Sequence, residues 1–594
     1  MRNPRRTAVL TAALLVTGVL AATPAAAAPA PSSAYATGWG GAVVSDTVEA
    51  TQAGIAVLRR GGTAADAAVA VGAVLNVTDP MMTGIGGGGY WVHYDARTRK
   101  VSTIDGRETA PRAADQNLFI DPATGQPYPF DQAVTSGRSV GTPGVLATWE
   151  RALDKWGRFD LDELLQPAIR VADRGFPLTP TLRGQIASNE ARFRQFDSTA
   201  ELFLPGGAVP EVGTIMRNPD LADTFREIAR HGTRSFYGGP IARDTAAAVQ
   251  NPPLADDATI TPPKGLLSTR DFKDYRTIDR KPTHVSYRGY DVYGMAPSSS
   301  GGMTVGMALN SLERFNLGSM PRDAALHHYL EASKLAYADR NRYIGDPAFV
   351  DVPQRELLKE SYGRARACLI DPIRVLPAPA APGNPHGPNV CTPPPPGAAT
   401  PEPEVHTTHF VVSDARGNVV SFTNTIEMVG GSGIVVPDRG FLLNNELTDF
   451  NFTPTQGNAP DPNLPAAGKR PRSSMTPTIV LRDGKPFLAV GSPGGSTIIT
   501  TVLQILVNRI DFGMPLTEAV AAPRASQRNS PTTVAEPAFI AAAAPLTARG
   551  HVFTPQTEIG AAAALEFTKH GQIHAVGEPV RRGTTHAAVV FPHP

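Results

Sequence analysis

The 594-residue sequence has little cysteine and little charge. It contains two cysteines, only 18% of its residues are charged, and its formal net charge is +1. A balanced charge favours neither nucleic acid nor an acidic membrane surface, so we expect no nucleic-acid partner. Two cysteines without a surrounding set of catalytic groups do not support a catalytic thiol. The chain is nevertheless long enough to bury a large core.

Long apolar runs are also absent, except at the N-terminus. There, basic residues precede the apolar run Ala8 to Ala22, and small residues follow at Ala25 to Ala30. This order predicts a secretion signal over residues 1–30. A membrane anchor is the alternative, but the run is short and ends in Pro and Ala. We therefore expect a secreted protein, or one associated with the cell envelope, without an anchor after signal cleavage.

Glycine and proline are abundant instead, with 56 of each, which indicates a loop-rich chain. The stretch from Pro377 to Pro403 is rich in proline and predicts an extended, solvated linker. Export permits a disulfide between Cys368 and Cys391, and closing that loop contributes about 3 kcal/mol. Two free buried thiols are the alternative to this disulfide.

The first part of the chain predicts helices followed by a hairpin. Residues 50–75 are typical of two helices broken at Gly61-Gly62, with a threonine cap before the second. Residues 90–94 and 101–104 predict paired strands, and we expect residues 105–111 to close that hairpin.

Three stretches suggest chemistry that their context does not support. The glycine run Gly86–Gly89 lacks the Lys and Ser/Thr of a phosphate-binding loop and the spacing of a dinucleotide fold. Ser298–Ser300 lacks the Gly-x-Ser-x-Gly elbow of a serine hydrolase. His327 and His328 are adjacent, so they point in different directions on a helix, and no third ligand is suitably spaced. We therefore expect no metal.

The second part of the chain begins with a strand, a turn and a return strand over residues 406–426. Thr423 and Thr425 lie two positions apart on the return strand and share a face. Five motifs follow one another in this region: Thr-Thr-His-Phe-Val-Val (407–412), Thr-Asn-Thr-Ile-Glu (423–427), Asn-Asn-Glu-Leu-Thr-Asp-Phe (444–450), Lys-Arg-Pro-Arg-Ser-Ser-Met (469–475) and Gly-Ser-Pro-Gly-Gly-Ser (491–496).

In order and spacing these motifs resemble the γ-glutamyltransferase family, and the likeness runs from about Gly41 to the C-terminus. The resemblance implies an α+β, N-terminal nucleophile hydrolase fold: a four-layer αββα sandwich. It also implies a precursor cleaved between His406 and Thr407. A large subunit, 31–406, and a small catalytic subunit, 407–594, would then build the fold jointly as a heterodimer.

Cleavage at this bond has a chemical purpose. A threonine hydroxyl is a weak nucleophile that needs a base. Once Thr407 becomes an N-terminus, its own α-amine, with an ordinary pKa near 7.7–8.0, can be that base. No metal or organic cofactor is then required. An ordinary strand threonine is the alternative for an isolated residue of this kind.

The resemblance also assigns roles to other residues. Thr425 hydrogen-bonds the nucleophile, and Gly494 and Gly495, before a helix, form the oxyanion hole, a role that suits glycine amides at a helix start. Three residues bind the α-carboxylate of the substrate: Arg107, Ser473 and Ser474. Three acidic residues, opposite Arg107, bind its α-ammonium: Glu427, Glu446 and Asp449.

The expected reaction is acyl transfer from a γ-glutamyl amide such as glutathione, completed by water or by an amino-acid or peptide amine. One alternative is a cephalosporin or glutaryl acylase of the same superfamily, which would not need the acidic pocket. Another is a secreted binding protein, which would remain a single uncut chain. The stretch between Phe450 and Lys469 is short and lacks Tyr and Trp, so we expect an open pocket. A role for Arg581 is only weakly indicated.

Overall fold

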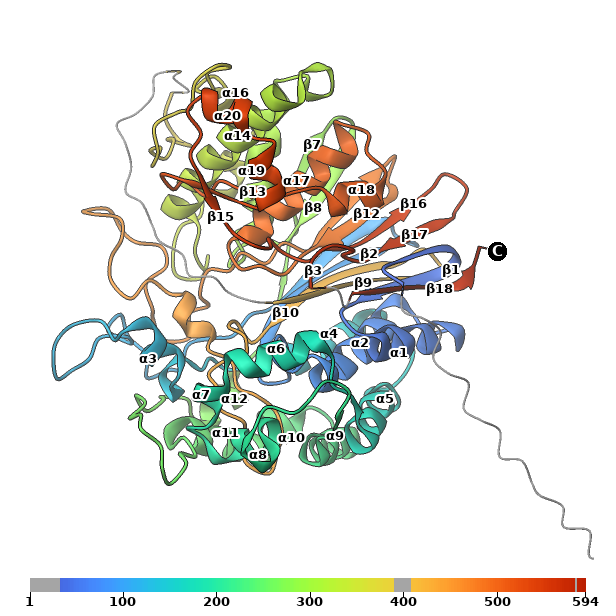
Figure 1. Cartoon of the computed structure of the whole chain (residues 1–594), viewed down its shortest axis with the longest axis vertical. Coiled ribbons are helices and arrows are strands. Elements are labelled where there is room, and N and C mark those ends of the chain that lie inside the picture. The colour runs from blue at the N-terminus through green and yellow to red at the C-terminus, as the bar shows by residue number, and fades with distance from the viewer. Residues whose placement is uncertain (1–32, 389–390, 392–406, 583–584, 594) are drawn as a thin grey trace, which may run out of the picture. The chain divides into compact units, whose positions relative to one another are not determined.

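The structure is a computed structural model that describes residues 33–388, 391, 407–582 and 585–593 (Figure 1). The predicted signal peptide, His406 and most of the proline-rich run lie outside the described residues. Among the helices that the structure describes, none combines the length and apolar character needed to cross a bilayer.

The centre of the fold is a 13-stranded sheet in which every strand pair is antiparallel. Its order is β6-β3-β2-β10-β9-β1-β17-β16-β12-β11-β8-β7, and β18 also pairs with β1. The strands are β1 (Tyr35–Ser45), β2 (Gly88–Asp95), β3 (Lys100–Gly106), β6 (Ile278–Arg280), β7 (Thr283–Tyr287), β8 (Tyr290–Gly294), β9 (Thr408–Asp414), β10 (Val419–Thr425), β11 (Thr478–Arg482), β12 (Lys485–Gly491), β16 (Ala563–Phe567), β17 (Ile573–Val576) and β18 (His586–Pro592).

The sheet doubles over into two stacked layers. Side chains of β1, β2, β9 and β10 share one buried cluster with side chains of β11, β12, β16 and β17. Successive side chains of a strand point to opposite faces. Accordingly, Val411 belongs to this inner cluster, whereas Phe410 and Val412 pack on the outer face against helices.

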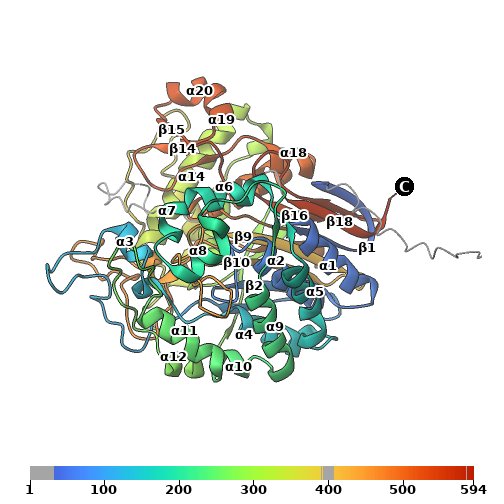
Figure 2. The ribbon, with the colours of Figure 1, turned by 60° about the horizontal axis from the view of Figure 1, so that its bottom comes forward.

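One helical layer covers the outer face of β2, β9 and β10. Figures 1 and 2 both show α5 and α9 side by side within it. Its helices are α1 (Val48–Arg59), α2 (Ala64–Thr78), α4 (Val145–Trp156), α5 (Leu161–Arg174), α6 (Pro180–Ser188), α7 (Glu190–Phe193), α8 (Asp197–Phe203), α9 (Pro219–His231), α10 (Arg234–Tyr237), α11 (Pro240–Gln250) and α12 (Thr269–Asp274).

A second helical layer packs on the outer face of β8, β11 and β12. Its helices are α13 (Gly301–Leu312), α14 (Arg322–Tyr343), α15 (Gln354–Leu357), α16 (Glu360–Ala367), α17 (Thr497–Ile510), α18 (Leu516–Ala521), α19 (Pro537–Ala541) and α20 (Ala544–Ala548). The strands thus lie between two helical groups (Figure 1), which confirms the predicted αββα sandwich. Segments before and after residue 407 contribute to both sheet layers.

Smaller elements complete the chain. A short helix, α3 (Phe130–Val134), stands apart from both helical layers (Figure 1). Two minor sheets are formed by β4 (Phe176–Pro177) with β5 (Ile215–Met216), and by β13 (Ala525–Ser526), β14 (Thr533–Ala535) and β15 (Phe553–Pro555).

Most local predictions are confirmed. The helices α1 and α2 are interrupted at residues 60–63, and Thr63 caps α2 in a reciprocal capping box with Asp66. The strands β2 and β3 pair as expected, but the chain turns at residues 96–99. Residues 105–111 therefore do not close the hairpin; β3 runs on to Gly106 because its pairing with β2 continues there.

The predicted disulfide is present. Cys368 and Cys391 are bonded, with their Cα atoms 5.5 Å apart. Cys368 directly follows α16, so the bridge holds Cys391 at the C-terminal end of that helix.

Candidate active site

Thr407 lies immediately before β9 and is 3% exposed. In the pairing of β9 with β10, Asn424 lies opposite Thr408, so the same register puts Thr425 opposite Thr407. Both threonines line one pocket. The two threonines are therefore neighbours across the strand pair, and a hydrogen bond from Thr425 to Thr407 stays a prediction.

The same pocket collects nearly all the other residues singled out in the sequence. They come from six separate segments of the chain and lie on both sides of residue 407. The predicted residues among its lining are Arg107, Thr407, Thr425, Glu427, Glu446, Asp449, Ser473, Ser474 and Gly495. Gly494 directly precedes Gly495 and is not itself part of the lining.

Gly494 and Gly495 form the turn that starts α17. Their φ angles are +127° and +54°, and a Cβ on Gly494 would lie 2.7 Å from Thr497 Oγ1. Their carbonyl groups accept hydrogen bonds from the amides of Thr497 and Ile498, each at 3.0 Å. Both conformations favour glycine. The turn therefore brings a glycine-rich backbone and a helix N-terminus to the pocket beside Thr407.

We had expected the three acidic residues to lie opposite Arg107. Instead, Arg107 is paired directly with two of them. Its guanidinium donates to Glu446 and to Asp449, and its side chain is 1% exposed. A buried arginine needs compensating carboxylates, and these two provide them. From the sequence we expected Arg107 and the acidic residues to bind opposite ends of a ligand. In the structure, Arg107 and two of these acidic residues form one ion-pair network.

Four carboxyl groups, those of Glu108, Glu427, Glu446 and Asp449, lie in or beside this network. Burial raises the pKa of Glu446 to about 7, and it raises the pKa of Glu427 well above its ordinary value, with Asp449 adding to the effect. Burial and the neighbouring Glu446 also raise the pKa of Glu108 well above its ordinary value. Glu427 Oε1 is buried, with no hydrogen-bond partner among the described residues. This oxygen is suited to a cationic group of a ligand.

Glu427 also has a strained backbone. Its φ is +84°, a value that side-chain-bearing residues rarely adopt. Thr425 Oγ1 accepts from the Glu427 amide at 2.8 Å, and the Glu427 carboxylate accepts from Asn445. These contacts hold the strained residue at the pocket, as is common at functional sites.

Ser298–Ser300, the rejected nucleophile candidate, has a supporting role. The Ser300 amide and hydroxyl donate to the Ser473 carbonyl at 2.7 and 2.6 Å, and Ser299 Oγ donates to the Met475 carbonyl at 2.6 Å. This serine run therefore fixes the backbone that presents Ser473 and Ser474.

Arg340 of α14, which the sequence did not single out, controls the direction of a hydroxyl group. Its Nη2 donates to Ser474 Oγ at 2.8 Å, and its Nε donates to Ser300 Oγ at 2.8 Å. Ser473 Oγ accepts from the Met475 amide at 3.1 Å. Guanidinium and amide groups only donate, so both hydroxyl groups keep their hydrogens for an acceptor in the pocket.

The glycine run packs beside the site. A Cβ on Gly87 would lie 2.1 Å from the Thr425 carbonyl oxygen, and one on Gly88 would lie 2.5 Å from Glu108 Oε2. The run has no room for side chains because its backbone lies directly against the residues that form the pocket.

The closing segment contributes through a different arginine from the one we considered. Arg581 pairs with Glu536 and Glu578, and it does not line the pocket. Its neighbour Arg582 instead donates to the Thr407 carbonyl at 3.2 Å. Adjacent arginines are difficult to distinguish by sequence, since their directions depend on the turn that carries them.

The stretch after Phe450 borders the pocket. Asp461 orders it by accepting from the Thr455 amide at 2.8 Å and the Asn463 amide at 2.9 Å. Phe452, a lining residue, stacks on Phe119 with ring centroids 4.2 Å apart. The openness predicted from the lack of Tyr and Trp remains a prediction, but an aromatic side chain does stand at this wall.

The αββα sandwich, with a pocket around the threonine that precedes a central strand, defines a class of enzyme: the N-terminal nucleophile hydrolases. The sequence model of the family described as Gamma-glutamyltranspeptidase matches residues 50–588, and the chain belongs to this family. It is therefore a self-processing acyltransferase and hydrolase.

Two kinds of relative are similar to the chain. The glutathione hydrolase proenzyme of Bacillus subtilis is 41% identical over 479 residues, which are 80% of this chain and 78% of that protein. The acylase ACY 1 proenzyme of a Pseudomonas species is 35% identical over 545 residues, 91% and 92% of the two chains. A cephalosporin acylase structure from Bacillus halodurans superimposes with a TM-score of 0.81 at 27% identity, covering 97% of this chain and all of that one.

Proposed function

We propose that the chain cleaves itself between His406 and Thr407, and that Thr407 then works as an N-terminal nucleophile on γ-glutamyl amides. The observation that carries this proposal is the pocket in which Thr407 and Thr425 meet an acidic network and two serine hydroxyls. Residues 31–406 would form the large subunit and 407–594 the small one of a heterodimer.

In this mechanism the hydroxyl of Thr407 attacks the carbonyl carbon of the amide while its α-amine accepts the proton. Amides of Gly494 and Gly495 stabilise the oxyanion. The intermediate collapses to an ester on Thr407, and the amine product leaves after it has taken up the proton. Water or an amine then attacks the ester and regenerates Thr407. Each step uses groups of the chain itself and needs no cofactor.

The charge balance of the pocket supports an acyl donor that carries an ammonium group. The pKa values of Glu427 and Glu446 are raised, which favours the neutral form of these carboxyl groups. A bound ammonium favours their ionised form. The hydroxyl groups of Ser473 and Ser474 are suited to the α-carboxylate of the same donor. Arg107 organises the acidic network in this proposal.

Replacing Thr407 tests the nucleophile and the processing together. We expect Thr407→Ala to accumulate as one full-length, inactive chain, because it lacks the hydroxyl group that both self-cleavage and attack on the substrate require. Thr407→Ser, which keeps the hydroxyl, is the matched control and should still give two bands. Denaturing gels and N-terminal sequencing of the smaller band provide the measurement. Cleavage of the alanine variant, or turnover by it, contradicts the proposal.

An acylase that takes donors without an amine is the second candidate. It is favoured by the acylase relatives, which align over more of this chain than the glutathione hydrolase of B. subtilis does. Turnover of γ-glutamyl-p-nitroanilide and glutaryl-p-nitroanilide separates the two, since the donors differ only in the amine. We expect the γ-glutamyl donor to be preferred; preference for the glutaryl donor supports the acylase. Two bands on the gel also exclude an uncut binding protein.

The export of the enzyme is part of the same proposal. A basic start followed by a short apolar run supports cleavage of residues 1–30 and secretion. N-terminal sequencing of the larger subunit from culture medium provides the test. A start at Met1 in cell-associated material contradicts it.

A further inference from the structure

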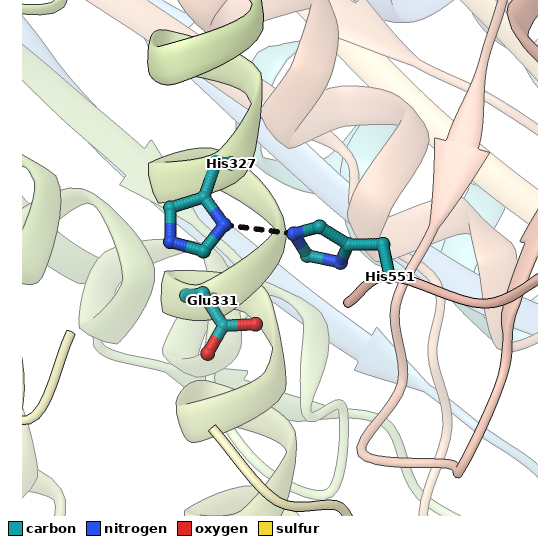
Figure 3. Close-up of side chains that lie close together, drawn as sticks. All are labelled: His327, Glu331 and His551. Atoms are coloured by element: carbon teal, nitrogen blue, oxygen red, sulfur yellow. Dashed lines mark hydrogen bonds between the residues drawn. The ribbon is translucent and has the colours of Figure 1, made fainter. Parts of the chain in front are cut away.

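Three metal-ligating side chains converge outside the pocket. His327 and Glu331 lie one turn apart on α14, and His551 reaches them from the segment between α20 and β15 (Figure 3). His327 Nδ1 and His551 Nε2 are 2.8 Å apart, and one ligand atom from each of the three residues falls within 4.8 Å of the others. All three residues are buried.

Neighbouring groups orient these side chains. His327 Nε2 lies 2.7 Å from the Asp371 carbonyl, which can only accept, so Nε2 carries the hydrogen and Nδ1 presents its lone pair. A ligating histidine is usually held in this way by its other nitrogen. The Leu376 amide donates to Glu331 Oε2 at 2.8 Å, and Lys334 Nζ donates to Glu331 Oε1 at 2.7 Å.

We propose that His327, Glu331 and His551 bind one divalent transition-metal ion, with Zn²⁺ as the best match. Two imidazole nitrogens and one carboxylate oxygen are a ligand set that zinc accepts, with a water in the fourth position. Bonds of about 2.0–2.1 Å in a tetrahedron hold two nitrogens about 3.3–3.4 Å apart, so the rings separate by about 0.5 Å on binding. Lys334 stays beside Glu331 and weakens the site.

From the sequence we expected no metal, because we considered His327 only together with His328. His327 was judged with His328, its neighbour in the sequence, but His328 Nδ1 lies 2.7 Å from the Ala324 carbonyl of its own helix. The partners of His327 are instead one helical turn away and 224 positions along the chain.

The metal is structural in this proposal, because none of its ligands lines the pocket. His327 and Glu331 precede residue 407 and His551 follows it, so the ion connects the two parts of the chain. If the chain is cleaved as proposed above, the ion is a clamp between the subunits. The metal site itself does not depend on that cleavage.

The test uses the full-length enzyme without a polyhistidine tag, freed of metal with a chelator. Zn²⁺ titrated calorimetrically should bind once per chain, and Co²⁺ should give the visible absorption of a tetrahedral site. At a hundredfold excess over Kd, Zn²⁺ should raise the melting temperature by about 2–5 °C. His551→Gln and His327→Gln should weaken binding at least 10–100-fold, the effect of losing even an outer partner.

His328→Gln is the matched control, because it alters a buried histidine on the same helix that is not one of the three ligands and whose Nδ1 contacts the Ala324 carbonyl, and it should bind like wild type. Equal Zn²⁺ binding by wild type and His551→Gln overturns the proposal. If wild type does not bind Zn²⁺, the proposal is also overturned, and His327 and His551 are only a hydrogen-bonded pair. If a variant does not fold, X-ray absorption at the zinc edge of wild type decides, since two imidazoles and one carboxylate are expected.

Discussion

At the scale of single residues, the site is governed by where charge is buried. Burial raises the pKa of Glu446 to about 7, and the neighbouring Arg107 offsets only part of that shift. Glu427 is held in a left-handed conformation at the same pocket. Such residues are costly for stability, so their presence indicates that the pocket is built for a ligand and not for packing.

Glu446→Gln should separate two effects of pH. A carboxyl with a pKa of about 7 is neutral below that pH and anionic above it. Its attraction for an ammonium group is therefore lost as the pH falls through 7, and KM for a γ-glutamyl donor should rise. In Glu446→Gln, KM should be higher and should depend less on pH between about 6 and 8 than it does in wild type. The acid fall in kcat, which belongs to the α-amine of Thr407, should remain.

Steady-state kinetics over this pH range provides the measurement. The glutaryl donor serves as the control, because without an ammonium group its KM should not depend on Glu446 in this way. A KM for the γ-glutamyl donor that keeps its pH dependence in the variant contradicts the assignment.

Arg340→Gln should act through Ser474. The substitution removes a donor to Ser474 Oγ and lets that hydroxyl turn away from the pocket. We expect KM to rise about tenfold, which corresponds to about 1.4 kcal/mol, with a smaller change in kcat. Arg322→Lys, at the other end of α14, is the control and should leave both constants unchanged. If kcat and the melting temperature both fall and KM does not rise, the role of Arg340 is structural only.

At the scale of elements, short signals in the chain determine where helices start. The capping box of Thr63 and Asp66 begins α2, a helix whose residues are all buried, so its start position sets the register of its packing. The carboxylate of Asp66 also accepts from the amide of Arg158 at 2.9 Å and thereby joins α2 to the chain before α5.

Thr63→Ala should lower stability by about 1 kcal/mol, because the Asp66 amide loses its acceptor at the helix start. Thr63→Ser keeps the hydroxyl and should lose less. Thermal melting of the two purified variants next to wild type measures the difference, and self-cleavage should be unaffected in both. A serine variant as unstable as the alanine variant contradicts a capping role.

At the scale of the whole molecule, the proposed cleavage before Thr407 would not divide the fold into two bodies. β9 follows that residue yet lies between β10 and β1, and β1 precedes it. Both sheet layers and the second helical layer contain segments from the two sides, and the first helical layer, which precedes residue 407, packs on β9 and β10, which follow it. Separating the parts would expose these cores to water.

The cleaved enzyme should therefore migrate as one species. We expect the two subunits to co-elute in size-exclusion chromatography without denaturant and to separate only in guanidinium chloride. Uncleaved Thr407→Ala provides the reference elution volume. A small subunit that elutes alone under native conditions contradicts this shared architecture.

Local features could be predicted from the sequence, because they depend on residues close together in the chain. The helix break before Thr63 and the strand pair around residues 90–104 follow from caps and alternating side chains. The five motifs also contain many of the residues that line the pocket, although Arg107 and Arg340 lie outside them. The hairpin turn was misplaced because residues 105–111 contain Asp-Gly and Pro, which are common in turns, whereas the true turn at residues 96–99 contains no Gly, Pro, Asn or Asp. Only the strand register locates it there.

The sequence by itself determined the αββα class, the threonine at the centre and the list of polar groups around it, since motifs record which residues are present. Only the tertiary structure decided how those groups meet. Arg107 faces carboxylates 339 and 342 positions away, Arg340 supports Ser474, and His551 reaches His327. A buried side chain takes its partner from whichever segment the packing brings near, and that choice leaves no mark on the neighbouring sequence.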